Sequence, residues 1–468
     1  MKKILLYILL PVLLINFVLL TSCTKKYTVT FYDYDGRLIE KVKVELFEEV
    51  PLPDDPIREG YVFLGWDSSL INISKDTVVF AKYIEITKSL DLQLSTDGSY
   101  YIVKGAKDFN QKTLYIPDEY NGIPIKEIAS SAFYYKSNLE YIYLTDNIET
   151  INGYAFACCR GLKKIKFGNK LEFIGVKAFE DCDALEEIIL PSSIKTISNY
   201  AFAECDMLTT LKINNANVNL YEGVFSDCSM LKNVQLSGKI EEIPNRCFQN
   251  CYNLEEITLP YGVESIGDDA FYSCDNLKSV IIPNSVTSIG SYAFTNCDSL
   301  TNVEIPDSVI RIDKNCFADC SALEQVKLSN NLTEIPEFCF SSCGKLSSID
   351  IPESVTTIGM YAFYYCSQLE EVNLPKNLKV IESNAFSRCF DLKSTLYLDN
   401  IEEIGSEAFS NCTSLKEVYI GSKIKNIGFY AFNCSRELTV YLAIDRQQSG
   451  WGYYWDNLVK EIIWNYKK

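Results

Sequence analysis

Phenylalanine recurs at a fixed interval through most of the chain. Fourteen phenylalanines follow one another every 23 residues from Phe133 to Phe432, with no insertion or deletion. The same apolar columns return around each of them, including a leucine six residues later. A unit of this length cannot bury its apolar face alone, so neighbouring units must stack to form a common core. The pattern predicts a β-rich solenoid of fourteen coils.

The coil of residues 351–375 shows how apolar and polar positions alternate within one unit. Leu369, Val372 and Leu374 follow a spacing in which one face of an extended segment points inward. Because the same spacing recurs from coil to coil, these segments predict a sheet that grows by one strand per coil. The polar residues between them are expected on its exposed face.

The other half of the same coil predicts a second extended edge and a turn. Val355 and Ile358 bring the chain back as a short extended segment, after which Gly359 is expected to permit a sharp bend. The stretch from Tyr361 to Cys366 is expected to form one short helical or 3₁₀ turn. In residues 394–400 the apolar pair slips by one position, and such a slip predicts a local kink.

These motifs resemble the BspA-type leucine-rich repeat. The resemblance covers about residues 91–468 and is carried by Ile-Pro-x-Ser-Val-Thr-x-Ile-Gly-x-x-Ala-Phe-x-x-Cys-x-x-Leu, as read from Ile351 to Leu369. It implies a right-handed solenoid with parallel strands. It also implies a role on the bacterial surface in adhesion and in contact with a host matrix or with other species.

Residues 27–85 predict a separate small β domain, because apolar and polar residues alternate around Val29 and Phe31. The segment resembles the internalin-type B repeat, a β-grasp-like module that serves as a spacer or adhesive accessory. The resemblance is carried by Val29-x-Phe31, Asp35-Gly36, Pro56, Gly60-Tyr61-x-Phe63 and Gly65-Trp66.

The two ends of the array are expected to differ from its middle. Residues 86–128 predict a hairpin and an N-terminal cap, residues 129–440 hold the 23-residue repeats, and residues 441–468 predict an aromatic C-terminal cap. The last segment contains Trp451, Trp455 and Trp464. These rings could cover the last coil or, alternatively, form a platform for carbohydrate.

The N-terminus predicts export. Residues 1–22 have two lysines, an apolar run and Leu-Thr-Ser before Cys23, which resembles a bacterial lipoprotein signal peptide. Cys23 is then the lipid attachment site, and residues 23–26 form the lipidated N-terminus. An uncleaved membrane anchor is the alternative, although residues 4–20 are barely long enough and contain Pro11. Both hypotheses place the rest of the chain outside the cytoplasm. In the first, a lipid anchors the protein to the bacterial cell membrane and the protein is exposed at the cell surface.

Composition excludes several classes of function. The 62 acidic and 44 basic residues give a net charge of −18, which repels nucleic acid. The chain has no histidine, so the usual activation of serine or cysteine nucleophiles is absent. Acidic residues that follow one another on a strand point to opposite faces, and charges of opposite sign alternate between coils. No catalytic residue, cofactor site or metal site is predicted, and the protein is expected not to be an enzyme.

The 18 cysteines predict buried thiols. Twelve of them lie three residues after the recurring phenylalanine, and three more occupy a column in which ten coils carry alanine. Residues stacked about 4.8 Å apart with parallel side chains are poorly placed for disulfides. The Cys-x-x-x-Cys pairs could suggest zinc, but the same column positions explain them without a metal.

Tyrosines around the recurring turn are candidate contacts for a partner, because tyrosine is a favoured residue at protein interfaces. The alternative is that each ring packs over the neighbouring coil. The candidates are Tyr200, Tyr292, Tyr361, Tyr364 and Tyr365.

The sequence therefore predicts a lipid-anchored, non-enzymatic surface protein. Its partners are the membrane, through Cys23, and an extracellular or host protein bound by the solenoid. The alternative is the capture of a glycan or nutrient.

Overall fold

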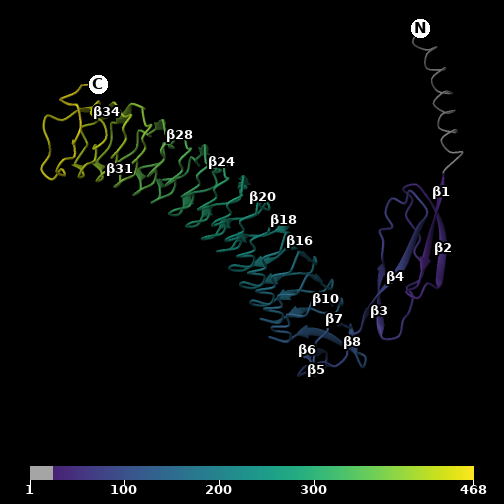
Figure 1. Cartoon of the computed structure of the whole chain (residues 1–468). Coiled ribbons are helices and arrows are strands. Elements are labelled where there is room, and N and C mark those ends of the chain that lie inside the picture. Colours follow the sequence, from purple (N-terminus) through teal and green to yellow (C-terminus); the bar gives the residue numbers. More distant parts are fainter. Residues whose placement is uncertain (1–24, 468) are drawn as a thin grey trace, which may run out of the picture. The chain divides into compact units, whose positions relative to one another are not determined.

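The computed structural model describes residues 25–467 and consists of strands and turns (Figure 1). The chain forms two compact units that divide between Thr87 and Lys88. Within the described residues no helix could cross a membrane.

The first unit is a small four-stranded sheet. Its strands are β1 (Lys26–Tyr32), β2 (Leu38–Glu45), β3 (Tyr61–Trp66) and β4 (Thr77–Glu85). They lie in the order β2-β1-β4-β3; β1 and β4 are parallel and the outer pairs are antiparallel. Val29, Phe31, Val44 and Val79 form its buried core. The small β domain expected from the alternating pattern is confirmed.

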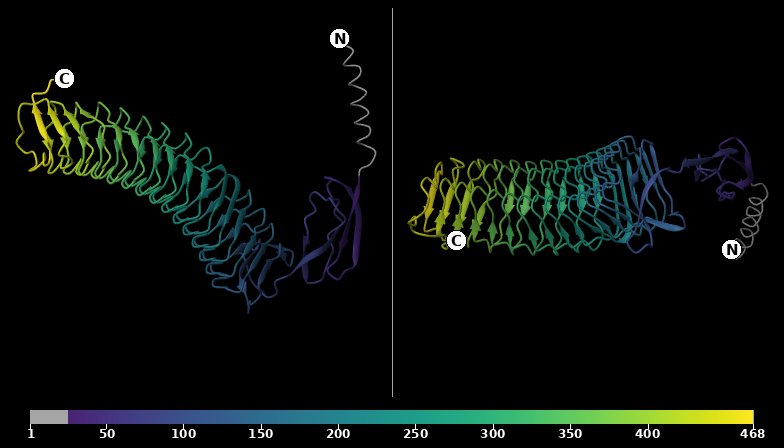
Figure 2. Two further views of the ribbon diagram at one scale, coloured as in Figure 1. Left: turned by 45° about the horizontal axis from the view of Figure 1, so that its top comes forward. Right: turned by 90° about the horizontal axis from the view of Figure 1, so that it is seen from below.

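The second unit is a β-solenoid with two series of parallel strands, seen along the rod in Figures 1 and 2. Series A comprises β7 (Thr113–Ile116), β10 (Tyr141–Leu144), β12 (Lys164–Lys166), β14 (Glu187–Leu190), β16 (Thr210–Asn217), β18 (Asn233–Lys239), β20 (Glu256–Thr258), β22 (Ser279–Ile281), β24 (Asn302–Glu304), β26 (Gln325–Lys327), β28 (Ser348–Asp350), β30 (Glu371–Asn373), β32 (Leu396–Leu398), β34 (Glu417–Ile420), β36 (Thr439–Leu442) and β37 (Glu461–Trp464).

Series B lies on the returning edge of each coil. It comprises β9 (Ile123–Ile128), β11 (Thr150–Ile151), β13 (Phe173–Ile174), β15 (Thr196–Ile197), β17 (Asn219–Leu220), β19 (Glu242–Ile243), β21 (Ser265–Ile266), β23 (Ser288–Ile289), β25 (Arg311–Ile312), β27 (Glu334–Ile335), β29 (Thr357–Ile358), β31 (Val380–Ile381), β33 (Glu403–Ile404) and β35 (Asn426–Ile427). The hairpin of β5 (Leu90–Leu94) and β6 (Tyr101–Ala106) continues this series at its N-terminal end, where β8 (Glu119–Tyr120) also pairs with β9.

The stack of phenylalanines runs through the core. Thirteen successive ring pairs have centroid distances of 5.1–5.8 Å and interplanar angles of 2–15°. Phe109 meets the first ring edge-on at 5.7 Å, and Trp455 meets the last ring edge-on at 6.3 Å. Offset stacking and edge-on contact are the favourable geometries for aromatic pairs. The stack therefore begins and ends against rings that stand across its direction.

The turn that carries each phenylalanine is not helical, so the expected helical or 3₁₀ turn is wrong. The residue two positions before the phenylalanine has a left-handed backbone, as at Tyr361, where φ is 57°. The amides of Tyr361, Phe363 and Tyr365 donate to carbonyls of the next coil at 2.8–3.1 Å. The amides of Ala362, Tyr364 and Cys366 donate instead to carbonyls three residues back within the turn, so bonds between coils and bonds within the coil alternate and no run of helical bonds forms.

Gly359 also differs from its expected role, because its φ is not positive. A Cβ at this position would lie 2.8 Å from the backbone nitrogen of Glu337 in the preceding coil. The glycine is therefore needed for the close approach of two coils rather than for a bend.

The slip in residues 394–400 interrupts strand pairing. Leu396 and Leu398 remain buried, and β32 pairs with β34 in a register one residue shorter, with Leu396 opposite Val418. β30 and β32 belong to different hydrogen-bonded groups, and the amide of Val372 donates to the hydroxyl of Ser394 at 3.2 Å. The side chain thus accepts a bond that would otherwise go to a neighbouring strand.

The cysteines form a column of thiols beside the phenylalanine stack. All seventeen cysteines within residues 25–467 are free, and Cys158 alone among them is partly exposed. Each of twelve thiols donates to the carbonyl of the phenylalanine in the preceding coil, with Sγ–O distances of 3.1–3.4 Å. The predicted column is confirmed, and the thiol supplies a weak donor that alanine lacks.

The C-terminal segment adds a further, irregular coil. Strand β37 pairs with β36, and the carbonyl of Trp455 accepts the amide of Phe432 at 2.9 Å. Trp451 and Trp455 are buried, and the indole of Trp451 donates to the carbonyl of Lys425 at 3.1 Å. These two rings cover the last coil and offer no open face to a carbohydrate.

We predict that the thiols are reduced and protected by folding. In the Cys23→Ser variant, a chromogenic thiol reagent should titrate seventeen thiols in denaturant without reductant, and only Cys158 should react in the native protein. Burial raises the pKa of the Cys320 thiol to about 12, which suppresses the reactive thiolate. A denatured count well below seventeen would mean that disulfides are present.

Candidate binding surface

The exposed face of series A presents side chains from successive coils in register. Strands β7 to β18 form one continuous six-stranded sheet. The next strands pair as β20-β22, β24-β26 and β28-β30, and β32, β34, β36 and β37 form a four-stranded sheet. Residues that lie opposite each other differ by one repeat, as do Tyr141 and Lys164, or Asn302 and Gln325. The face is therefore a set of short columns whose chemistry can be read by following one repeat position from coil to coil.

Opposite charges bridge neighbouring coils on this face. Glu140 accepts from Lys112 at 2.5 Å and from Lys163 at 2.9 Å, and Glu255 likewise pairs with Lys232 and Lys278. Hydrogen bonds from the two lysines lower the pKa of each glutamate to about 2. Both carboxylates are thus engaged as ion-pair acceptors, and their low pKa does not suit them to donate protons near neutral pH.

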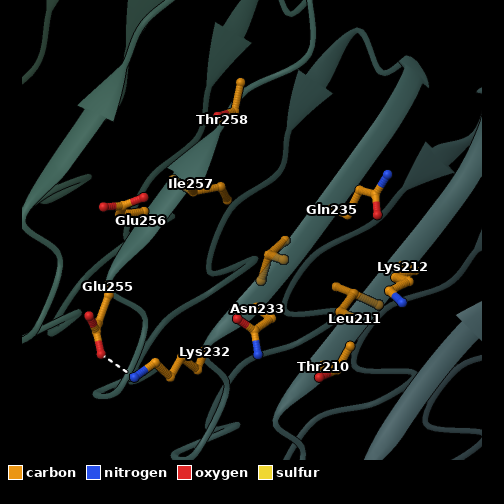
Figure 3. A pocket seen from close by; sticks show the side chains of 11 residues that line it. Thr210, Leu211, Lys212, Lys232, Asn233, Gln235, Glu255, Glu256, Ile257 and Thr258 are labelled. Carbon is orange, nitrogen blue, oxygen red and sulfur yellow. Dashed lines mark ion pairs between the residues drawn. The ribbon is translucent and has the colours of Figure 1, made fainter.

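An open groove lies where the continuous sheet ends. It has a volume of about 440 Å³ and crosses β16, β18 and β20. Strands β18 and β20 are not paired with each other. Figure 3 shows the Lys232–Glu255 ion pair on one side of the groove and Lys212 on β16. The groove is lined by Lys212 and Lys232 of one half of the face and by Glu255 and Glu256 at the start of the other half.

Three of the candidate tyrosines lie together. Tyr361 stacks on Phe338 at 4.7 Å, Tyr361 and Tyr364 meet edge-on at 5.3 Å, and Tyr365 meets Phe390 edge-on at 6.0 Å. Tyr361 and Tyr364 are half-buried, whereas Tyr365 is 43% exposed. Tyr361 packs over the preceding coil, as expected if its ring covers a neighbouring coil rather than contacting a partner. Tyr365 is the most exposed of the three rings.

The other two candidate tyrosines lie apart from this cluster. Tyr200 donates to Glu222 at 2.8 Å and accepts from Arg246 at 3.3 Å, while its ring covers Gly223. A Cβ on Gly223 would lie only 2.2 Å from that ring, so a larger residue there would displace the Tyr200 ring. Tyr292 is half-buried and donates its amide to the carbonyl of the next coil. The five candidates therefore do not form one site.

Cys23, the predicted lipid attachment site, lies outside the described residues. Among residues 25–467, no group of three or more cysteine, aspartate or glutamate side chains could hold a metal ion.

An acidic cluster on the turn edge was missed by the sequence reasoning. A cavity of about 500 Å³ is lined by Arg160, Asp181, Asp183, Glu204, Asp206 and Asp227. Arg160 bonds Asp181 at 2.7 Å and lies 3.7 Å from Asp183. Burial, with a hydrogen bond to Asp181, raises the pKa of Asp183 to about 6. The signal was present, because these acids recur two and four residues after successive phenylalanines.

Aromatic rings on the C-terminal part of series A were also missed. Tyr419 stacks between Tyr397 at 5.1 Å and Tyr441 at 4.3 Å, and Tyr466 lies against Tyr419 at 5.0 Å. The register shift at β32 brings Tyr397 opposite Tyr419. Tyr397, Tyr419 and Tyr441 are paired in the sheet but do not follow the 23-residue spacing. The cluster is therefore not apparent when the sequence is aligned by that repeat.

Comparison with known proteins agrees with this architecture. The profile of the BspA type Leucine rich repeat region matches in six copies, over residues 126–255, 241–367 and 333–448. The chain belongs to the BspA-type leucine-rich repeat family. Ahead of its BspA-type repeats, residues 27–91 match the Listeria-Bacteroides repeat domain. Both matches are to repeat modules, and neither is to a catalytic family.

Two solved structures that resemble this chain are leucine-rich repeat proteins from bacteria. A leucine-rich repeat protein from Bacteroides ovatus ATCC 8483 is 26% identical, with a TM-score of 0.66 over 81% of this chain and 99% of that chain. A leucine rich cell surface protein from Faecalibacterium prausnitzii A2-165 is 26% identical over 68% of this chain and 93% of that chain, with a TM-score of 0.39. No curated protein matches the chain.

We predict that replacing Asp183 by asparagine raises the melting temperature at about pH 7.5 by about 1–2 °C. A carboxyl whose folded-state pKa is raised to about 6 lowers the free energy of unfolding as it loses its proton with rising pH. Asparagine does not ionise, so the variant avoids this loss of stability. At about pH 4 the effect should vanish, because Asp183 is then largely protonated when folded.

The matched control for this prediction is Asp319→Asn, an exposed aspartate whose neighbours in the same column are Asn296 and Ser342. Calorimetry at both pH values measures the difference between the variants. An equal gain from both substitutions, or a gain for Asp183→Asn that does not depend on pH, would contradict the assignment.

Proposed function

We propose that this protein is a lipid-anchored bacterial surface protein that binds other proteins, as in adhesion, through the exposed face of series A. The observation that carries the proposal is the continuous sheet from β7 to β18, which presents charged and aromatic side chains on an open surface. Extended surfaces of this kind suit protein partners, whereas small molecules are usually bound in enclosed pockets.

A non-enzymatic role agrees with the chemistry of the face. The carboxylates of Glu140 and Glu255 are each held by two lysines. Hydrolysis of a glycosidic bond instead needs two carboxyl groups that face the substrate, one of them protonated. The chain also has no histidine to serve as a base near neutral pH.

Glycan capture is a second candidate, favoured by one observation. Tyr397, Tyr419, Tyr441 and Tyr466 form an aromatic cluster at the C-terminal end of series A, and Tyr397 is 52% exposed. Aromatic rings with polar edges suit carbohydrate as well as protein surfaces. This cluster lies at the opposite end of series A from the continuous six-stranded sheet.

We predict that Cys23 anchors the protein. In a bacterium that processes lipoproteins, the wild-type protein should fractionate with membranes and be cut by protease added to intact cells. The Cys23→Ser variant should lose membrane attachment because it cannot be acylated. Cys158→Ser is the matched control and should behave as wild type. Retention of Cys23→Ser in the membrane would support an uncleaved anchor instead.

We predict that the purified protein binds members of a panel of extracellular matrix and cell-surface proteins but not a glycan array. Biolayer interferometry measures the first and fluorescence scanning the second. A response confined to the array would replace protein binding by glycan capture. Failure on both surfaces would reject the proposed function.

The same binding measurement tests the candidate tyrosines. A variant with Tyr361, Tyr364 and Tyr365 replaced by serine should lose affinity at an unchanged melting temperature if the cluster contacts the partner. Loss of folding instead would assign these rings to packing between coils.

A further inference from the structure

Charge is distributed unevenly along the exposed face of series A. The series A strands from β7 to β18, with the residue directly before each, carry seven lysines and three glutamates: Lys112, Lys163, Lys164, Lys166, Lys212, Lys232 and Lys239, against Glu140, Glu186 and Glu187. Strands β20 to β34, counted in the same way, carry three lysines and eight acids: Lys278, Lys327 and Lys416, against Glu255, Glu256, Glu304, Glu324, Asp350, Glu370, Glu371 and Glu417. The N-terminal half is therefore cationic in a chain whose net charge is −18.

Three lysines of the cationic half have no ion pair. Lys112, Lys163 and Lys232 pair with glutamates of neighbouring coils, whereas no carboxylate within residues 25–467 forms a salt bridge with Lys164, Lys166 or Lys212. Lys164 and Lys166 are exposed and Lys212 is half-buried. Such amines keep their full charge available to an incoming group.

Apolar surface lies beside these three lysines. Tyr141 is opposite Lys164 in the sheet, Tyr143 is opposite Lys166, and Ile189 is opposite Lys212. Ile189 is 44% exposed, and both tyrosines are half-buried. The unpaired charges are thus interleaved with side chains that can bury apolar area.

The opposite charge gathers on the turn edge of the same coils. The cavity around Asp183 holds five acidic side chains and one basic residue, Arg160. Lysines are therefore concentrated on one side of coils that are acidic on another. A partner with a local negative patch is attracted to the cationic half and repelled from the turn edge and from the later strands.

We propose that strands β7 to β18 form a docking site for an acidic protein surface, with Lys164, Lys166 and Lys212 as the charged contacts. This inference rests on the proposed protein-binding function and specifies its site and its partner class. Six strands about 4.8 Å apart span about 24 Å, which is the scale of one side of an ordinary protein interface.

An acidic protein fits this surface better than a long polyanion. A nucleic acid or sulfated glycan carries negative charge along its whole length, and beyond β18 it would run over the acidic half of the face. A protein presents a bounded patch of charge with apolar side chains beside it. Tyr141, Tyr143 and Ile189 supply the complementary apolar contacts.

The test compares a short peptide rich in glutamate, tyrosine and leucine with its glutamine twin and with a heparin oligosaccharide, using fluorescence anisotropy. The wild-type protein should prefer the glutamate peptide, and the affinity should fall as salt rises from about 50 to about 200 mM. The variant Lys164→Glu, Lys166→Glu, Lys212→Glu should bind the peptide at least about tenfold more weakly. If it does not fold, the corresponding triple glutamine variant replaces it.

The matched control reverses three lysines elsewhere on the solenoid, Lys345, Lys379 and Lys423, all exposed and outside series A. It changes the net charge equally and should stay within about twofold of wild type. Equal loss in both variants, equal binding of the two peptides, or stronger binding of heparin than of the glutamate peptide would overturn the proposal.

The outcome is separable from that of the proposed function. A protein from the matrix panel that binds the triple variant as tightly as wild type would reject this docking site and leave protein binding intact. Absence of any protein ligand in the panel would instead reject the proposed function itself.

Discussion

The register between coils is the constraint on which the rest of the solenoid depends. Backbone hydrogen bonds join neighbouring coils around the turn that holds the phenylalanine, and they also join them along series A and series B wherever successive strands pair. A residue at one position is consequently held next to its equivalent one repeat later. The phenylalanine stack, the column of thiols and the ion pairs between coils all follow from this one spacing, because each requires the same side chain to return at the same place.

The same constraint explains where the surface changes. The long strands β16 and β18 end the continuous part of series A, and their register shifts between Asn214 and Asn217. The groove crosses both strands and the unpaired gap before β20. The change in charge along the face occurs at the same place. Backbone pairing and surface chemistry therefore mark the same boundary, although the core beneath it continues without a break.

Much of the core could be predicted from the sequence, because a strict repeat fixes which residues stack. The phenylalanines, the thiols and the strand positions required only the periodicity. The left-handed turn could not be read in this way, since tyrosine, lysine, aspartate and asparagine all occupy its first position and none of them signals a positive φ in the way that glycine does. The role of Gly359 was misjudged because its close neighbour, Glu337, comes from another coil.

The candidate surface was harder to predict than the core. The sequence indicated individual tyrosines as candidate contacts, but in the structure they lie on different coils and contact different residues. The cationic half of series A and the acidic turn edge become visible only when charges are followed along columns and compared between faces. The aromatic cluster at Tyr419 depends on a register shift that a strict repeat conceals.

The edge-on rings at the two ends of the phenylalanine stack have a consequence for how such a chain can vary. Phe109 and Trp455 both stand outside the run of fourteen phenylalanines. Duplication or deletion of a whole repeat in the C-terminal half would leave both of these rings, and strands β7 to β18, unchanged. The length of the rod could thus change in steps of about 4.8 Å while its ends and its cationic surface stay the same. The length of the array and the chemistry of its N-terminal surface can therefore evolve independently in this architecture.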